Sequence, residues 1–324
     1  MKILLLVFLA SLSLHAQDLP PSFLWPTNWP PRVHDPSTIV REGTNCFVFS
    51  TGKGIFARRS TDLVTWTNAP SVFAELPASV RELPFNHRGW LWAPDVIRVG
   101  ERWLLYYSIS EFGKNTSAIA LASNPTLDST STNYAWRDDG IVVRSGRTNN
   151  FNAIDPAAFC DDDGKLWLAF GSFWSGIQLV ALDAHTGKLA STNQLRLAWS
   201  KAIEAASIAK HGADYFLFVN WGICCRGTNS TYEIRVGRSS AVTGPYRDRF
   251  GRDLCEGNGE PFLQSDGRFV GPGHASVVRD GTNDFVSFHF YDATRRGAAT
   301  LGVRRLQWDT NGWPQAGQWF SPAP

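Results

Sequence analysis

One pattern recurs five times along the chain: a polar or charged residue, a short apolar strand, a glycine-containing turn and an aromatic-rich strand. The repeats lie at intervals of about 50–70 residues, a period typical of repeat architectures. Their turn glycines are Gly43, Gly100, Gly164, Gly212 and Gly281. The five segments read HDPSTIVREGTNCFVFST, LWAPDVIRVGERWLLYYS, IDPAAFCDDDGKLWLAFGS, EAASIAKHGADYFLFVN and GHASVVRDGTNDFVSFHF.

These repeats predict the fold class. Apolar residues alternate with period two between Gly, Asn and Asp turns, whereas apolar repeats at helical spacing are nearly absent. A unit of this size cannot bury the faces of its own sheet, so the repeats must pack on one another. A pair of β-sandwiches or a β-helix has similar strand content, but neither predicts one long hairpin per repeat. Radial packing of four-stranded sheets does, and it keeps sheet edges short. We therefore predict an all-β, five-bladed β-propeller.

The register of the repeats brings particular side chains together. Counting back seven to nine residues from each turn glycine reaches Asp35, Asp155, Glu204 and His274, and in the second repeat a position near Trp92. If each apolar strand is the innermost of its blade, these residues meet at one end of the central channel. Taken singly, each has a structural explanation: Asp before Pro commonly starts a turn, and Trp92 suits a core. Residues that only start turns, however, need not occupy equivalent positions in every repeat. The shared position of these candidates therefore favours a common functional site.

Three carboxylates at one site indicate acid–base chemistry. Mutual repulsion raises the pKa of at least one of them, so an acid and a base coexist at neutral pH. Glycoside hydrolysis needs such a pair, and a tryptophan suits the face of a sugar. Divalent metal binding is the competing chemistry, but the chain has no DxDxDG loop to form a tight calcium cage.

The N-terminus and the overall charge restrict location and partners. MKILLLVFLASLSLHAQ has one lysine, an apolar run and a small residue at position 16, which predicts a signal peptide at residues 1–16 and a single propeller domain at 17–324. We expect an exported monomer, periplasmic or secreted, with no membrane span. A net charge of +2 without basic runs argues against nucleic acid.

The 14 tryptophans and five cysteines leave questions open. The tryptophans suit either a sugar-stacking surface or an aromatic core. Cys46 and Cys160 lie in apolar strand-like runs, which predicts buried thiols. The vicinal Cys224 and Cys225 are compatible with two thiols or with a disulfide.

The motifs together resemble glycoside hydrolase family 43, and most closely its endo-α-1,5-L-arabinanase branch. The resemblance covers almost all of the chain after the signal peptide, and the long stretch CCRGTNSTYEIRVGRS is its most specific part. The other motifs, in order, are VHDPS, LWAPDV, AIDPAAF, GSFWSGIQL, IEA and GPGH.

The resemblance implies roles for individual residues. Asp35 matches the general base that activates water, Glu204 the general acid, and Asp155 the carboxylate that orients the acid and tunes its pKa. Inversion would place the base and acid carboxyls about 6.5–9.5 Å apart. His274 matches a residue that binds calcium or a similar ion in the central channel, mainly through waters. The positions that match sugar-contacting residues are Trp92, Asn152, Ser172 and Trp174.

The implied substrate is plant cell-wall arabinan, including arabinan side chains of pectin, cleaved by endo action. Two departures affect substrate preference and the ion site: Glu204 is followed by Ala-Ala instead of Ala-Pro, and His274 by Ala instead of Asn. An exo-acting α-L-arabinofuranosidase or β-xylosidase of the same family remains an alternative. So does a sugar-binding propeller without catalysis, since fold alone implies no chemistry.

Overall fold

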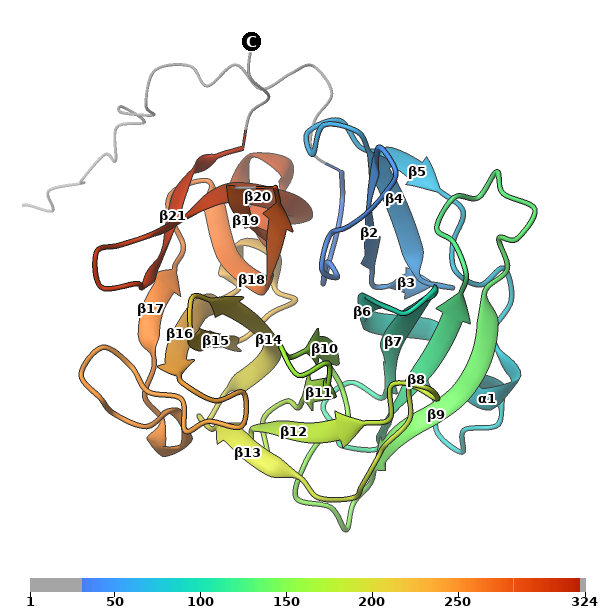
Figure 1. Ribbon diagram of the computed structural model, residues 1–324, viewed down its shortest axis with the longest axis horizontal. Coiled ribbons are helices and arrows are strands. Elements are labelled where there is room, and N and C mark those ends of the chain that lie inside the picture. Colours follow the sequence, from blue (N-terminus) through green and yellow to red (C-terminus); the bar gives the residue numbers. More distant parts are fainter. Residues whose placement is uncertain (1–30, 282, 321–324) are drawn as a thin grey trace, which may run out of the picture.

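The computed structural model describes residues 31–281 and 283–320 and confirms the all-β, five-bladed β-propeller. Five antiparallel sheets are arranged radially around a central axis (Figure 1). The expected signal peptide at residues 1–16 and the start of the domain at residue 17 lie outside the described residues. Within the described part, no helix is both long and apolar enough to cross a bilayer.

Each blade is a sheet whose strands follow one another outward from this axis, with one addition in the second blade. Blade one consists of β1 (Val40–Glu42), β2 (Asn45–Ser50), β4 (Phe56–Ser60) and β5 (Thr67–Ala69). Blade two consists of β3 (Gly52–Lys53), β6 (Trp90–Val99), β7 (Arg102–Ser110), β8 (Ser117–Asn124) and β9 (Arg137–Ser145), and helix α1 (Ala78–Arg81) precedes β6.

The remaining three blades have four strands each. Blade three consists of β10 (Ala157–Cys160), β11 (Leu166–Phe170), β12 (Ile177–Leu182) and β13 (Leu195–Ala198). Blade four consists of β14 (Ile203–His211), β15 (Asp214–Trp221), β16 (Glu233–Ser239) and β17 (Glu260–Leu263). Blade five consists of β18 (Phe269–Asp280), β19 (Asn283–Asp292), β20 (Ala298–Trp308) and β21 (Pro314–Trp319). The short 3-10 helices are η1 (Gly227–Asn229), η2 (Leu254–Glu256) and η3 (Ala293–Arg295).

The five predicted turn glycines do connect the inner strand of each blade to its second strand. All five have positive φ, between 58° and 76°. In blade one, Glu42 pairs with Asn45, so the loop is only Gly43 and Thr44. A two-residue hairpin loop of this kind requires a positive φ, which glycine adopts without steric cost.

The N-terminal end of the described chain pairs with the last blade. The Val33 N–H donates to the Ala299 carbonyl over 3.2 Å, and the Leu301 N–H donates to the Pro31 carbonyl over 3.2 Å. These bonds join the segment before blade one to β20 and so connect the first and last blades. They also place His34 next to blade five.

Among the residues that the structure describes, the hydrophobic core is divided into five buried clusters, one between each pair of neighbouring blades. Phe49 and Leu105, for example, belong to the cluster between blades one and two, and Val48 and Val303 to the cluster between blades five and one. Several tryptophans contribute to these interfaces, as Trp103 does in the first cluster. Burial of this kind is the dominant stabilising contribution to such a ring. The aromatic composition therefore largely reflects the core.

Candidate active site

A backbone feature repeats in every blade, before the inner strand or in its first half. One non-glycine residue there adopts the left-handed conformation, with φ between 44° and 58°. Such conformations are costly for residues with a side chain and cluster at functional sites. We call these the left-handed residues; in chain order they are Asp35, Ala93, Asp155, Ala205 and His274.

The N–H of each left-handed residue is held by a side chain from the preceding blade. For four of the five left-handed residues, the accepting side chain lies on the second strand of the preceding blade or directly after that strand. These four hydrogen bonds measure 2.8–3.1 Å. The four acceptors, in the order of the residues they hold, are His289 for Asp35, Thr51 for Ala93, Ser108 for Asp155 and Asn220 for His274.

Blade four differs because the corresponding position in blade three is Gly171. The Gly171 N–H donates to the Ile154 carbonyl over 2.9 Å, as the Thr51 N–H does to the His34 carbonyl in blade one. Gly171 is therefore equivalent to Thr51, but it has no side chain to accept a hydrogen bond. A Cβ added there would lie 2.3 Å from the carbonyl oxygen of Gly176. The N–H of Ala205 instead donates to Oδ2 of Asp155 over 3.2 Å. Asp155 therefore supports the backbone directly after Glu204.

This register refines the sequence prediction by one residue. Asp35, Asp155 and His274 are left-handed residues, as equivalent positions should be. Glu204 and Trp92 each precede one, so counting from the turn glycines wrongly made Glu204 equivalent to the other three. The count varied because the hairpins differ in length and the inner strands carry β-bulges. The residues that precede the left-handed ones are His34, Trp92, Ile154, Glu204 and Gly273.

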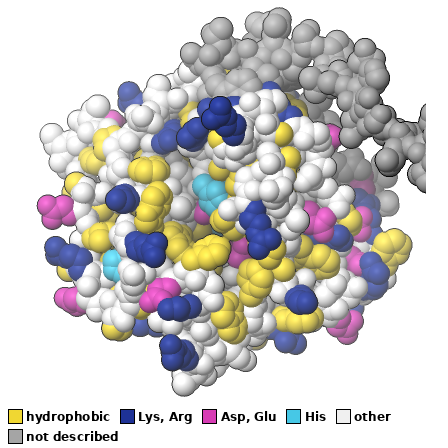
Figure 2. Space-filling view, turned by 180° about the vertical axis from the view of Figure 1, so that it is seen from behind, with side chains coloured by type: hydrophobic (Ala, Val, Ile, Leu, Met, Phe, Trp, Pro, Cys, Tyr) yellow, Lys and Arg dark blue, Asp and Glu magenta, His cyan; other side chains and the backbone are white. Residues whose placement is uncertain are grey.

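All eight residues predicted for the site line one cavity of about 1000 Å³. They are Asp35, Trp92, Asn152, Asp155, Ser172, Trp174, Glu204 and His274. In the view of Figure 2, a hollow near the centre of the face contains a histidine and acidic side chains, with hydrophobic and basic side chains around it. The arrangement suits a ligand with both polar groups and apolar faces.

Asp35 lies in an environment that stabilises its ionised form. Oδ2 accepts hydrogen bonds from Thr51 Oγ1 at 2.6 Å and from His34 Nδ1 at 2.8 Å, and His274 Nδ1 lies 3.5 Å from Oδ1. Burial alone would raise the pKa of Asp35, but His34 and His274 outweigh it and hold that pKa well below its usual range. Asp35 is therefore a carboxylate at neutral pH, available to accept a proton.

Glu204 and Asp155 lie in an environment that favours the protonated form. Burial raises the pKa of Glu204, although hydrogen bonds from the hydroxyls of Tyr232 and Ser172 partly oppose it; the Ser172 bond measures 2.7 Å. Burial, together with the charge of Glu204, raises the pKa of Asp155 well above its usual range. The cavity thus holds one carboxyl whose pKa is lowered and two whose pKa is raised, which is the kind of pairing that acid–base catalysis requires.

His274 balances the negative charge of these groups. Burial lowers the pKa of His274, but Asp35 above all, with Asp155 and Glu204, outweighs it and raises that pKa to about 9. At neutral pH the ring is therefore an imidazolium. A hydrated cation would compensate the same carboxylates, with His274 then neutral and able to act as a ligand.

The donor set around His274 suits an ion that keeps its water. Over the described residues, two groups of three His, Cys, Asp or Glu side chains lie close enough to share an ion, and both contain His34. His274 belongs to neither group, so an ion bound at its ring would have few direct protein ligands, and water would complete its shell. That fits the expected mostly hydrated ion and does not fit an all-protein calcium cage.

The four predicted sugar-contacting residues differ in their surroundings. Trp174 and Trp92 both line the cavity; Trp174 is 42% exposed, and Trp92 is less exposed, being half-buried. Asn152 is buried and accepts a hydrogen bond from Ser117 Oγ at 2.6 Å through its amide oxygen. Ser172 lines the cavity and donates its hydroxyl proton to Glu204. Phe112, which the sequence analysis did not single out, lines the same cavity with its side chain 78% exposed.

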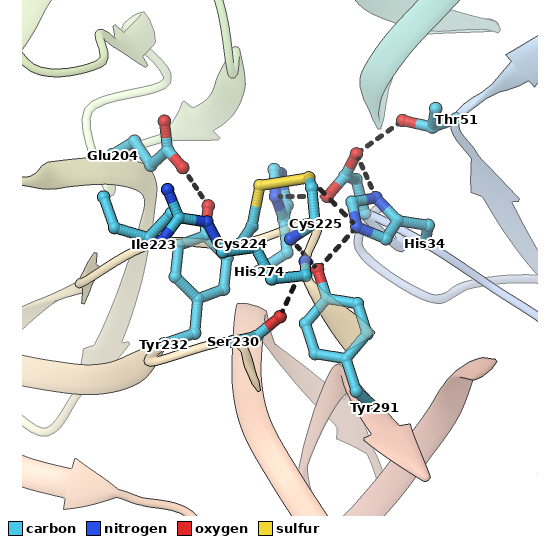
Figure 3. Close-up of a disulfide and its surroundings, with 12 residues drawn as sticks. His34, Thr51, Glu204, Ile223, Cys224, Cys225, Ser230, Tyr232, His274 and Tyr291 are labelled. Carbon is cyan, nitrogen blue, oxygen red and sulfur yellow. Dashed lines mark hydrogen bonds and ion pairs between the residues drawn. A yellow bond between two sulfur atoms is a disulfide. The ribbon is translucent and has the colours of Figure 1, made fainter. Parts of the chain in front are cut away.

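Cys224 and Cys225 form a vicinal disulfide on the wall of the cavity (Figure 3), which answers the question that the sequence left open. Its neighbours include His34 and Tyr291, two residues that sequence reasoning missed. The sequence analysis expected both Cys46 and Cys160 to be buried. Cys46 is, but Cys160 is exposed at the end of β10.

A propeller whose cavity holds one carboxyl with a lowered pKa and two with raised pKa values is typical of a glycoside hydrolase. Residues 29–314 match the glycosyl hydrolases family 43, and the chain belongs to this family. It is 40% identical over 298 residues to an extracellular exo-α-(1→5)-L-arabinofuranosidase of Cellvibrio japonicus, covering 87% of this chain and 86% of the relative. It is 38% identical over 291 residues to an extracellular endo-α-(1→5)-L-arabinanase of Bacillus subtilis, covering 87% of each.

A solved structure shares the architecture. The Cellvibrio cellulosa α-L-arabinanase in complex with arabinohexaose superimposes with a TM-score of 0.85 at 39% identity, covering 89% of this chain and 96% of that one. Within its family, the chain thus belongs to the arabinanase branch, where exo- and endo-acting enzymes both occur.

Proposed function

We propose that this enzyme hydrolyses α-1,5-L-arabinofuranosidic bonds of arabinan by an inverting mechanism, with endo action. Asp35 is the general base and Glu204 the general acid. The observation that carries this assignment is the opposite direction of their pKa shifts across one cavity: the pKa of Asp35 is lowered and the pKa of Glu204 is raised. Relatives that act on α-(1→5)-linked arabinose support the choice of substrate.

The reaction follows from these protonation states. A water held at the Asp35 carboxylate loses its proton to that carboxylate while its oxygen bonds to the anomeric carbon. At the same time the glycosidic bond breaks, and Glu204 gives its proton to the departing oxygen. Asp155 holds Ala205 and so fixes the backbone next to the acid. The product should first appear as the β-anomer, which proton NMR of a fresh reaction distinguishes from the α-anomer.

Endo action is supported by the size of the cavity. About 1000 Å³ exceeds the space that one pentose unit needs, so several units of a chain fit around the scissile bond. The alternative is exo action as an α-L-arabinofuranosidase, and the identity to the Cellvibrio japonicus relative favours it.

A time course with debranched arabinan separates the two modes. Endo cleavage yields a ladder of oligosaccharides early, with a rapid fall in viscosity, whereas exo cleavage yields one small product from the start. Chromatography of samples at low conversion therefore tests the proposal, and a single early product would contradict endo action. Absence of any cleavage of arabinan would contradict the substrate assignment.

A hydrated divalent cation such as calcium, bound at His274, is part of the proposal. When bound, it would supply positive charge among the three carboxylates. The residues that would hold it are His274 directly and the carboxylates through water. We also propose that the protein is exported, which the apolar N-terminal run and the extracellular relatives support.

A further inference from the structure

A chain of three hydrogen bonds extends from the Asp35 carboxylate to the disulfide loop (Figure 3). His34 Nδ1 lies 2.8 Å from Asp35 Oδ2, and His34 Nε2 lies 2.8 Å from the hydroxyl oxygen of Tyr291. The same hydroxyl oxygen accepts the backbone N–H of Cys225 over 2.8 Å. The chain joins the start of blade one, blade five and the loop after β15.

With a neutral His34 ring, the protons in this chain have one consistent arrangement. The ionised Asp35 can only accept, so His34 Nδ1 must carry a proton. His34 Nε2 then has a lone pair and must accept from Tyr291. The Tyr291 oxygen already accepts the Cys225 N–H, which leaves its own proton to be donated to His34. The Asp35 carboxylate thus sets the direction of the chain, and the Cys225 N–H, which can only donate, is consistent with it.

The His34 ring is also held on its face and at its edge. It stacks on the ring of His289 with a centroid distance of 4.4 Å and an interplanar angle of 22°. Cys225 Sγ lies 3.7 Å from His34 Nε2, and the disulfide bond to the adjacent Cys224 restricts the position of this sulfur. His289 in turn accepts the backbone N–H of Asp35 over 3.1 Å. A ring fixed in this way has one orientation in which to donate to Asp35.

From this geometry we propose that His34 is a positioning residue for Asp35, held in its Nδ1–H form by Tyr291. The inference rests on the proposed role of Asp35 as general base. His34 and Thr51 both donate to Oδ2, so Oδ1, which lies 3.5 Å from His274 Nδ1, is the oxygen that accepts the proton of the attacking water. The contribution of His34 is therefore to the chemical step and not to substrate affinity.

Two substitutions of His34 separate this role from simple packing. In His34→Asn, the amide nitrogen can occupy the place of Nδ1 and still donate to Asp35. In His34→Gln, the side chain is closer in size to histidine, but its amide reaches the place of Nε2 and the bond to Asp35 is lost. We expect kcat on debranched arabinan to fall by roughly 10- to 100-fold in His34→Gln, the loss typical of one hydrogen bond to a charged group, and clearly less in His34→Asn. KM should stay unchanged in both. Equal losses, or a smaller loss in His34→Gln, would overturn the proposal.

Tyr291→Phe tests the second bond of the chain without changing the size of the ring. We expect kcat to fall by roughly 3- to 10-fold at constant KM, because His34 loses the partner that fixes its proton. The matched control is Tyr106→Phe, which removes a buried hydroxyl bonded to the Gly187 carbonyl over 2.9 Å, between blades two and three. It should leave kcat unchanged, and the unfolding midpoints show whether both variants are folded. An unchanged kcat in Tyr291→Phe, or an equal loss in Tyr106→Phe, would overturn the proposal.

Asp35→Asn distinguishes failure of this inference from failure of the proposed function. If Asp35→Asn is inactive while the His34 and Tyr291 variants behave as wild type, Asp35 is the base but His34 does not position it. If Asp35→Asn retains wild-type kcat, Asp35 is not the base, and both the proposed function and this inference fail.

Discussion

Asp155 accepts the backbone N–H of Ala205 through Oδ2 over 3.2 Å. The other left-handed residues donate to side chains on or just after a second strand, but blade three has Gly171 at that position. The carboxylate thus has two functions at once. It contributes to the electrostatics of the cavity, and it supports the peptide that follows Glu204.

The two functions of Asp155 can be separated by substitution. Asp155→Asn keeps an oxygen that can accept the Ala205 N–H, whereas Asp155→Ala leaves this buried N–H unpaired. We expect both variants to lose most activity, but Asp155→Ala to unfold with a free energy about 1–3 kcal/mol below that of Asp155→Asn. Urea denaturation of the two proteins measures the difference. Equal stabilities would mean that the Ala205 bond does not stabilise the fold.

Gly171 should tolerate no side chain. It has φ 132°, and an added Cβ would lie 2.3 Å from the Gly176 carbonyl oxygen. We expect Gly171→Ala to lower the free energy of unfolding by about 2–4 kcal/mol, through backbone strain and overpacking together. Gly212→Ala is the control, because Gly212 has φ 59° but open space around it, and should cost only about 1 kcal/mol. A Gly171→Ala variant as stable as the control would contradict the steric argument.

Tyr232 should influence the pH at which the alkaline limb of the pH–rate profile falls, because it changes the pKa of Glu204. Burial raises the pKa of Glu204, and the hydrogen bond from Tyr232 opposes it by stabilising the carboxylate. Tyr232→Phe removes that opposition, so the pKa of Glu204 rises further and the general acid stays protonated to higher pH. The alkaline limb of kcat/KM should move up by roughly one pH unit, the value of one hydrogen bond to a charged group. A move toward lower pH would contradict Glu204 as the acid.

The proposed ion should depend on His274. We expect metal analysis of the purified protein to detect a bound divalent cation, and His274→Ala to lose it. Treatment with a chelator should lower the unfolding midpoint of the wild type but not that of the variant, because only a species that binds the native state stabilises it. An equal metal content in the two proteins, or none in the wild type, would contradict an ion held by His274.

The sequence predicted the fold because the same hairpin recurs in every blade. The turn glycines mark the end of the inner strand, and the opposite end of that strand lies at the cavity, so Asp35, Asp155 and His274 could be brought together by counting back. Glu204 was brought to the same cavity by the same count, although its exact register was one residue different. Loop length and β-bulges caused that difference, and hydrophobic periodicity does not reveal either.

The partners of the carboxylates were harder to predict. Thr51 occupies the position that Ser108 and Asn220 occupy in other blades, but the residue type there varies from blade to blade. Tyr291 lies on the second strand of blade five, and the roles of both residues depend on contacts between blades. His34 did carry a signal: it occupies the same register position as Glu204 and Trp92. That signal appears only when the left-handed residues are used to align the blades.

The central claim is that Asp35 and Glu204 act as base and acid on opposite sides of one scissile bond. It is tested most directly by assaying Glu204→Gln and Asp35→Asn on debranched arabinan and on an aryl α-L-arabinofuranoside with an acidic phenol as leaving group. Such a phenol departs without protonation, so Glu204→Gln should lose most activity on arabinan but retain much of any wild-type activity on the aryl substrate. Asp35→Asn should be inactive on both, because water is then not activated. If Glu204→Gln loses activity equally on the two substrates, or Asp35→Asn retains activity on either, the assignment of acid and base is wrong.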